Sequence, residues 1–182
     1  MIVYHVVTGR PMHPGQRLQF DENHCSGVYR RVQEKREAVE AVYAAPEQYE
    51  GFALEHHLAV ALRELAMEEV RQEKYLPYPS RLRCLYASGT LEEAESWAVF
   101  FAEIGRPTYS IVKIQVDGHS FCGNAERCFD GSADRCSNRR LAEQYWENPY
   151  DGSGICEMLV DGEIEVVEIV KEINANLPED AE

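Results

Sequence analysis

The sequence has no long hydrophobic run and no excess of basic residues, and each shortage excludes a class of protein. No apolar stretch reaches the roughly 18 residues that a membrane-spanning helix needs, so we expect no membrane partner. Lys and Arg number 18 against 32 Asp and Glu, which gives a formal net charge of −14. Proteins that bind a nucleic-acid backbone need a basic surface, and this composition argues against that class.

Several enzyme motifs are also absent. The sequence contains no P-loop, no G-x-G-x-x-G after a strand, no H-E-x-x-H and no G-x-S-x-G. The first residues lack a basic stretch followed by a long apolar run, so we expect no secretory signal. We therefore expect a cytoplasmic protein whose six cysteines are reduced thiols.

Cys122, Cys128 and Cys136 lie near one another in the sequence, and His119 precedes them. Such side chains bind zinc, but structural zinc sites usually contain two cysteines separated by two to four residues, and that spacing is absent. We expect loop thiols here and no metal, with a zinc site as the alternative.

Hydrophobic residues make up 45% of the 182 residues, which is enough for a packed core. The length fits one domain, which we expect over residues 1–173. Residues 174–182 are acidic and predict a flexible tail.

The hydrophobic pattern predicts an α+β fold with helices grouped toward the N-terminal half. Apolar runs predict strands at residues 2–7, 82–88, 109–116, 155–160 and 164–169, and the last two resemble a hairpin joined by Asp161-Gly162. Helical spacing predicts helices at residues 27–45, 52–74 and 141–146, and another that Thr90 opens with a capping box to Glu93. In the 52–74 helix, Glu64 is expected on the solvent side. Residues 118–138 are polar and predict a long loop.

Three short pieces suggest chemistry, although each has an ordinary structural explanation. His5 lies in an apolar strand, where it needs a polar partner or is simply satisfied within the core. Tyr86 lies in a strand that leads into the capped helix, as strands often do. Glu157 interrupts an apolar strand after a glycine-rich loop. An acid there could equally keep an exposed edge strand soluble.

In this order, the pieces resemble the ADP-ribosyltransferase superfamily, in the branch whose triad is His, Tyr and Glu. The matching segments are Tyr4-His5-Val6-Val7, Leu85-Tyr86-Ala87-Ser88 with Glu93-Ala94-Glu95-Ser96-Trp97-Ala98, and Glu157-Met158-Leu159-Val160-Asp161-Gly162. The resemblance covers residues 1 to about 172. It is closest to an uncharacterised bacterial subfamily that shares Pro79-Ser80-Arg81 and Tyr145-Trp146.

The resemblance implies a split, strongly bent β-core with NAD⁺, the co-substrate, lying across its cleft. His5 would hydrogen-bond the ribose of either the adenosine or the nicotinamide half, and Tyr86 would stack on the nicotinamide ring. Glu157 would bind the 2′-hydroxyl of the nicotinamide ribose and stabilise a cationic transition state, which needs a nearby negative charge.

Other contacts follow from the same resemblance. Thr8, Gln16, Ser88 and Arg81 are further candidates for contacts with NAD⁺, and Arg81 would meet the pyrophosphate, because an arginine fork matches phosphate oxygens. Glu165 is a rival catalytic acid, since Glu163-Ile164-Glu165 resembles the E-x-E pair of arginine-modifying members. We prefer Glu157, because the L-V-x-G continuation follows it.

The expected function is transfer of ADP-ribose from NAD⁺ to an unidentified acceptor, with release of nicotinamide. The acceptor is a protein, a nucleic acid or a small molecule, and the oligomeric state stays open. The alternative is a non-catalytic relative that binds a nucleotide or a partner protein.

Overall fold

A computed structural model describes residues 1–49 and 51–174, and within this range the chain forms seven strands, five α-helices and two short 3₁₀ helices. The α+β class is therefore confirmed. Apart from Asn174, the tail predicted over 174–182 lies outside the described residues. No helix in the described part of the chain is long and apolar enough to cross a membrane.

The strands are β1 (Ile2–Val7), β2 (Arg17–Phe20), β3 (Leu85–Ala87), β4 (Ser110–Asp117), β5 (Ser120–Asn124), β6 (Cys156–Val160) and β7 (Gly162–Glu172). The helices are α1 (Gly27–Glu34), α2 (Arg36–Ala44), η1 (Pro46–Gln48), α3 (His56–Lys74), α4 (Leu91–Glu103), η2 (Ala125–Arg127) and α5 (Arg135–Glu147).

The strands form two antiparallel sheets, one with the order β1-β4-β7-β2 and one with the order β3-β6-β5. An isolated bridge connects them, in which Tyr4 and Ser88 exchange backbone hydrogen bonds of 2.9 and 2.8 Å. Because β4 pairs with β7 and β5 pairs with β6, one two-stranded ribbon runs through both sheets and bends between them.

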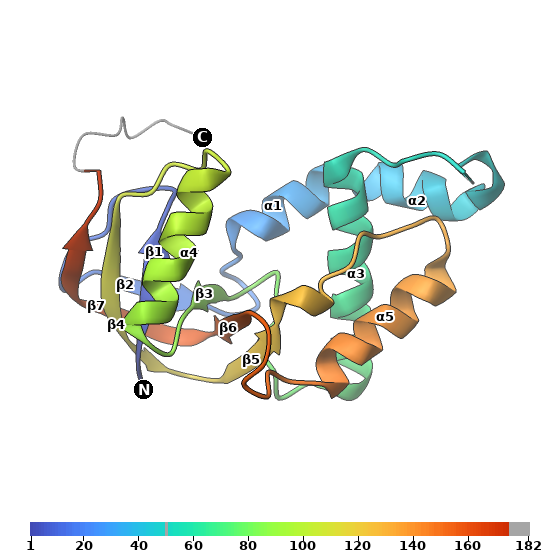
Figure 1. The fold of residues 1–182 in the computed structure, drawn as a ribbon. Helices are drawn as coiled ribbons and strands as arrows, with labels where there is room; N and C mark the ends of the chain where they lie inside the picture. Colours follow the sequence, from blue (N-terminus) through green and yellow to red (C-terminus); the bar gives the residue numbers. More distant parts are fainter. Residues whose placement is uncertain (50, 175–182) are drawn as a thin grey trace.

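Side chains from both sheets form the central core, and helices cover the outer faces. Leu85 and Val160 of one sheet pack with Val112 and Ile114 of the other. Helices α3 and α5 cover the far side of the three-stranded sheet, and α1 and α2 pack on α3. Helix α4 lies on the other side, against β1 and β4 (Figure 1).

Several predicted elements are confirmed with small changes at their ends. The first strand and the strand over residues 109–116 are present, and Thr90 and Glu93 form the predicted capping box of α4. The helix predicted over residues 27–45 is two helices that meet at Lys35. The ammonium group of Lys35 lies 3.0 Å from Glu55, which caps the start of α3.

The predicted hairpin at Asp161-Gly162 is wrong. Strand β6 pairs with β3 and β5, whereas β7 pairs with β4 and β2. One residue separates the two strands, which is too short for a two-residue hairpin turn. The chain instead bends at Gly162, whose φ is +83°, and passes from one sheet to the other.

The long loop predicted over residues 118–138 is also wrong, because it contains β5, η2 and the start of α5. Strand β5 has polar and glycine residues, but its backbone pairs with β6 and Phe121 is buried. Helix α5 begins at Arg135 rather than near residue 141, and the side chain of Asp134 caps it by accepting a hydrogen bond from Ser137 N.

The chain passes from one sheet to the other at residues 117–119 and again at residues 161–162, and these two segments lie against each other. The backbone N–H of His119 donates to Asp161 Oδ1 over 2.8 Å, and Asp161 N donates to the carbonyl of His119 over 3.2 Å. A side chain at Gly118 would overlap the carbonyl of Asp161, and one at Gly162 would overlap that of Asp117. The bend therefore requires glycine on both strands.

We predict that Gly118→Ala lowers the free energy of unfolding by about 2–3 kcal/mol, because the new methyl group meets rigid backbone. Urea unfolding measures this change. Gly9→Ala is the matched control, since a Cβ at Gly9 meets no atom within 4 Å. Equal stabilities for the two variants would contradict the close approach at the bend.

Candidate functional site

Glu157 of β6 is a buried carboxylate held by three donors. Its side chain shares the strand face of Leu159, which packs toward α3 and α5, and the residue is 8% exposed. Glu157 Oε1 accepts hydrogen bonds from Arg81 Nη1, from the Tyr145 hydroxyl at 2.7 Å and from the Cys128 thiol at 3.4 Å.

The second carboxylate oxygen of Glu157 has a different environment. Oε2 accepts no hydrogen bond from any described residue. No buried side-chain nitrogen or oxygen in the described part of the chain lacks a partner, so Oε2 keeps contact with solvent. The protein thus fixes one oxygen of Glu157 by hydrogen bonds and leaves the other without a described donor.

Arg81 links Glu157 to a second buried carboxylate, that of Glu64 on α3. Arg81 Nε and Nη2 donate to Glu64 over 2.8 and 3.2 Å, while Nη1 donates to Glu157 and, over 2.8 Å, to the Tyr145 hydroxyl. Arg63 Nη2 also lies 3.0 Å from Glu64. The result is a buried chain of alternating charges.

Burial and charge together fix the protonation states around Glu157. Burial raises the pKa of Glu64, but the Arg81 charge outweighs it and the net shift is downward. Burial lowers the pKa of Arg81, but Glu157 and Glu64 raise it well above the ordinary value. Burial raises the pKa of the Tyr145 hydroxyl, and that of the Cys128 thiol to about 12. At neutral pH, Arg81, Tyr145 and Cys128 all carry the protons that they donate.

The expectation that Glu64 faces solvent is wrong, because the residue is 1% exposed. Helix α3 lies between α5 and the pair α1 and α2, so more than one of its sides is covered. The available signal was Arg81, which directly precedes the strand predicted over residues 82–88. A buried arginine needs carboxylate partners.

Arg81 was expected at the NAD⁺ pyrophosphate, and the structure gives it other partners. The residue is 3% exposed, and its guanidinium group donates to Glu64, Tyr145 and Glu157 inside the protein. Its charge therefore acts on these carboxylates rather than at the surface.

Tyr86 of β3 lies close to the same arginine. Leu85 and Ala87 face the core between the sheets, whereas the Tyr86 side chain faces the cluster that includes α3 and α5. The Arg81 Cζ atom lies 5.6 Å from the centre of the Tyr86 ring. Burial raises the pKa of Tyr86 well above its usual value, so its hydroxyl stays protonated.

His5 is a neutral histidine with a defined hydrogen-bonding role. It shares the strand face of Val3 and Val7, and its Nδ1 lies 2.7 Å from the carbonyl oxygen of Tyr86. A carbonyl accepts only, so Nδ1 carries the proton. Burial, with the Arg106 charge as a smaller cause, lowers the pKa of His5 to about 4. Nε2 is then an acceptor for a hydroxyl group.

The three predicted triad residues therefore do not all contact one another. A chain of contacts connects them instead. His5 binds the Tyr86 backbone, the Tyr86 ring lies over Arg81, and Arg81 binds Glu157. Among the hydrogen bonds of residues 1–49 and 51–174, none joins the His5 ring to Glu157.

Two of the other predicted NAD⁺ contacts lie near His5. Thr8 Oγ1 accepts a hydrogen bond from Arg106 Nη2 over 3.0 Å. Ser88 is buried, and its backbone forms the bridge to Tyr4 that connects the two sheets.

Gln16 and Glu165 belong to the part of the four-stranded sheet around β2 and β7. Gln16 Oε1 accepts from His13 N over 3.2 Å in the loop before β2. The Glu165 side chain is 48% exposed and lies 3.4 Å from Arg17. Glu165 is on a different sheet from Glu157 and lacks its enclosed setting.

The possible zinc ligands do not come together. Cys122 lies in β5, Cys128 in the loop after η2 and Cys136 in the first turn of α5, while His119 lies 3.1 Å from Asp161. No group of three or more His, Cys, Asp or Glu side chains suited to a metal occurs in the part of the chain that the structure describes. The loop prediction holds for Cys128 and is wrong for Cys122 and Cys136.

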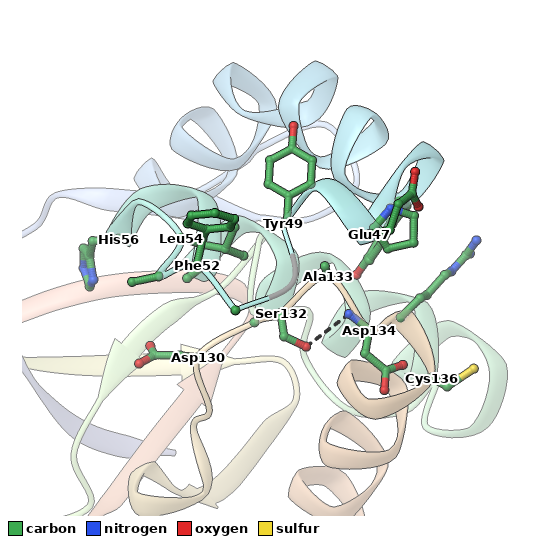
Figure 2. A pocket seen from close by; sticks show the side chains of 17 residues that line it. Glu47, Tyr49, Phe52, Leu54, His56, Asp130, Ser132, Ala133, Asp134 and Cys136 are labelled. Atoms are coloured by element: carbon green, nitrogen blue, oxygen red, sulfur yellow. Dashed lines mark hydrogen bonds between the residues drawn. The ribbon is translucent and has the colours of Figure 1, made fainter.

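The described helices and the loops beside them line at least two cavities. The larger, of about 1050 Å³, opens between η1, the start of α3 and the loop before α5 (Figure 2). Its walls include the apolar residues Tyr49, Phe52 and Leu54 and the acids Glu47, Asp130 and Asp134. A smaller one of about 250 Å³ lies between α3 and α5. Neither is lined by His5, Tyr86 or Glu157.

Sequence reasoning assigned no role to Tyr145 or Gly123. Tyr145 lies on α5, and its hydroxyl reaches Glu157. Gly123 lies opposite Glu157 on β5, and a Cβ there would overlap the Tyr145 hydroxyl. The glycine thus makes room for the hydrogen bond, a requirement that appears only once β5 and α5 are packed together.

The pKa of His5 predicts a specific dependence of stability on pH. Because this pKa is about 4 in the folded state and 6.5 as the reference value, the unfolded chain binds a proton first as the pH falls. The stabilisation from neutral His5 is complete above about pH 6.5 and is lost as the pH falls toward 4. We expect a loss of about 2–3 kcal/mol between pH 7.5 and 4.5.

Urea unfolding of the wild type and of His5→Asn at several pH values measures this effect. The variant removes the titrating group, so its stability should depend less on pH over this range. His13→Asn, at an exposed position, should behave as the wild type. An unchanged pH dependence in His5→Asn would contradict the prediction.

Comparison with known proteins gives a family without an assigned activity. A search of curated proteins finds no match. The family model DUF2441, described as a protein of unknown function, matches residues 3–172. The match covers most of the chain, and the protein therefore belongs to the DUF2441 family.

Proposed function

We propose that the protein is an NAD⁺-dependent ADP-ribosyltransferase, which transfers ADP-ribose to an acceptor and releases nicotinamide. One observation carries the proposal. Glu157 is a buried carboxylate with three donors on Oε1, whereas Oε2 has no donor among the described residues and keeps contact with solvent. An enzyme that stabilises a cation at a sugar carbon needs a carboxylate fixed in this way.

The reaction accounts for the placement of this charge. When the bond between ribose C1′ and the nicotinamide nitrogen breaks, the electron pair leaves with nicotinamide and positive charge develops on the ribose. Glu157 Oε2 would accept a hydrogen bond from the ribose 2′-hydroxyl and stabilise that charge. A nucleophilic group of the acceptor then bonds to C1′ and loses its proton.

His5 and Tyr86 would bind the two ends of the nicotinamide riboside. Neutral His5 offers Nε2 to a ribose hydroxyl, because Nδ1–H is bound to the Tyr86 carbonyl. The Tyr86 ring offers an aromatic surface to the cationic pyridinium. The bent β-core with two sheets supports this arrangement.

NAD⁺ is an anion at its pyrophosphate, so a protein of charge −14 needs a local cation to bind it. Arg106 meets this need better than the buried Arg81. It is exposed, it donates to Thr8 over 3.0 Å, and its charge contributes to the lowered pKa of His5. Among the described carboxylates, none forms an ion pair with it. We propose Arg106 as the pyrophosphate contact.

We also propose that the reaction takes place in the cytoplasm. All six cysteines are free thiols, which supports a reducing compartment.

Incubation with NAD⁺ and measurement of released nicotinamide tests the function. Glu157→Gln should lower the rate at least about 100-fold, since it removes the charge while keeping the shape of the side chain. Glu165→Gln should change the rate less than about twofold, because Glu165 lies on the other sheet. Transfer of labelled ADP-ribose in a lysate treated with protease or nuclease then identifies the class of acceptor.

Thermal unfolding of Glu157→Gln shows whether the variant is folded at the assay temperature. A folded Glu157→Gln that keeps full activity would contradict the proposal. Loss of activity in Glu165→Gln alone would move the catalytic role to that residue.

The second candidate is a non-catalytic relative that binds a small molecule or a partner protein. The large cavity beside η1 favours it, because that cavity lies apart from the Glu157 carboxylate and needs no chemistry there. Calorimetry would then show ligand binding without nicotinamide release, and Phe52→Ser at the cavity wall would weaken binding while Glu157→Gln would not.

A further inference from the structure

We propose that Arg81 is a positioning residue that holds Glu157 in its reactive orientation, and that Glu64 on α3 holds Arg81 in turn. This inference rests on the proposed function, since it assigns a role in the same reaction. It assigns a role in the reaction to Glu64 of the helical layer, which acts on Glu157 through Arg81.

The shape of the guanidinium group allows it to bind two carboxylates at once. One edge of Arg81, Nε with Nη2, donates to both oxygens of Glu64 over 2.8 and 3.2 Å. The remaining nitrogen, Nη1, donates to Glu157. Because the group is planar and rigid, a fixed contact on the Glu64 side sets the direction of the bond to Glu157.

The tyrosine hydroxyl closes a small ring of hydrogen bonds around the same oxygen. Tyr145 accepts from Arg81 Nη1 over 2.8 Å and donates to Glu157 Oε1 over 2.7 Å. Every donor to the Glu157 carboxylate among residues 1–49 and 51–174 binds Oε1, so rotation of the carboxylate would break several bonds together. Oε2, which keeps contact with solvent, is therefore held in one position.

The balance of charges explains how the carboxylates of Glu64 and Glu157 can both be buried around Arg81. Arg81 lies between the two carboxylates, and Arg63 lies 3.0 Å from Glu64 on its outer side. Two cations thus balance two anions. A nearby opposite charge favours the ionised form of a buried carboxylate, which is the form that stabilises a developing cation.

The test uses Arg81→Lys, Arg81→Met and Glu64→Gln, with Arg83→Met as the matched control. Arg83 lies on the same segment, but its guanidinium lies over the ring of Tyr29, at 5.8 Å, and makes no contact with the cluster. Rates of nicotinamide release against NAD⁺ concentration and pH are measured for each variant that is folded by thermal unfolding. Arg81→Lys keeps the charge and is the variant to use where Arg81→Met does not fold.

We expect kcat to fall at least about tenfold in Arg81→Lys and further in Arg81→Met, with KM for NAD⁺ changed less than about threefold. The lysine variant keeps a positive charge, so it should recover part of the activity that the methionine variant loses. In Arg81→Met the acid limb of the profile of kcat against pH should move to higher pH. Glu64→Gln should lower kcat with KM unchanged, and Arg83→Met should match the wild type.

A crystal structure of Arg81→Lys without NAD⁺ separates this proposal from the proposed function. A rotated Glu157 carboxylate supports positioning even if the wild type releases no nicotinamide, in which case the proposed function fails alone. Wild-type activity in a folded Arg81→Lys, or an unmoved carboxylate, overturns the positioning role while the function stands. A lower melting temperature with unchanged kcat and pH profile also overturns it.

Discussion

The buried ion-pair chain of Glu64, Arg81 and Glu157 is the constraint on which the rest of the arrangement depends. Two carboxylates and a guanidinium group can leave water together only if their geometry satisfies each of them. Removing one partner from such a cluster costs about 3–5 kcal/mol, because the remaining charge stays buried. The surrounding helices and strands must therefore keep the positions that preserve these hydrogen bonds.

This constraint joins parts of the chain that are far apart in sequence. Helix α3 supplies Glu64, the segment before β3 supplies Arg81, and α5 and β6 supply Tyr145 and Glu157. The helical layer and the three-stranded sheet thus share one polar centre inside an apolar interface. A glycine opposite Glu157 leaves the space that this centre needs.

Local patterns predicted local structure well, and pairings between distant segments escaped them. The first strand and the capping box of α4 follow from short stretches of sequence, and both are present. The Asp161-Gly162 sequence resembles a hairpin turn, but β6 and β7 pair with strands of different sheets. The partner of each strand depends on the other strands of the fold, which a short stretch of sequence does not contain. Glu64 resembled a solvent-exposed residue, because its partner, Arg81, is seventeen residues away and lies outside the helical pattern. The motifs nominate His5, Tyr86 and Glu157 as candidates, which stays a prediction, and they gave no sign of the hydrogen bonds that hold Glu157.

The bend at Gly118 and Gly162 has a mechanical consequence. Strands β5 and β6 leave the four-stranded sheet together at this point, as the two arms of one ribbon. Glu157 lies four residues before Asp161, a distance of roughly 13 Å along an extended strand. The carboxylate therefore lies near the end of the ribbon that is farthest from the two glycines. A difference of about 5° in the angle of the bend would displace Glu157 by roughly 1 Å, so the interlocked backbone at the bend sets the accuracy with which Glu157 is placed.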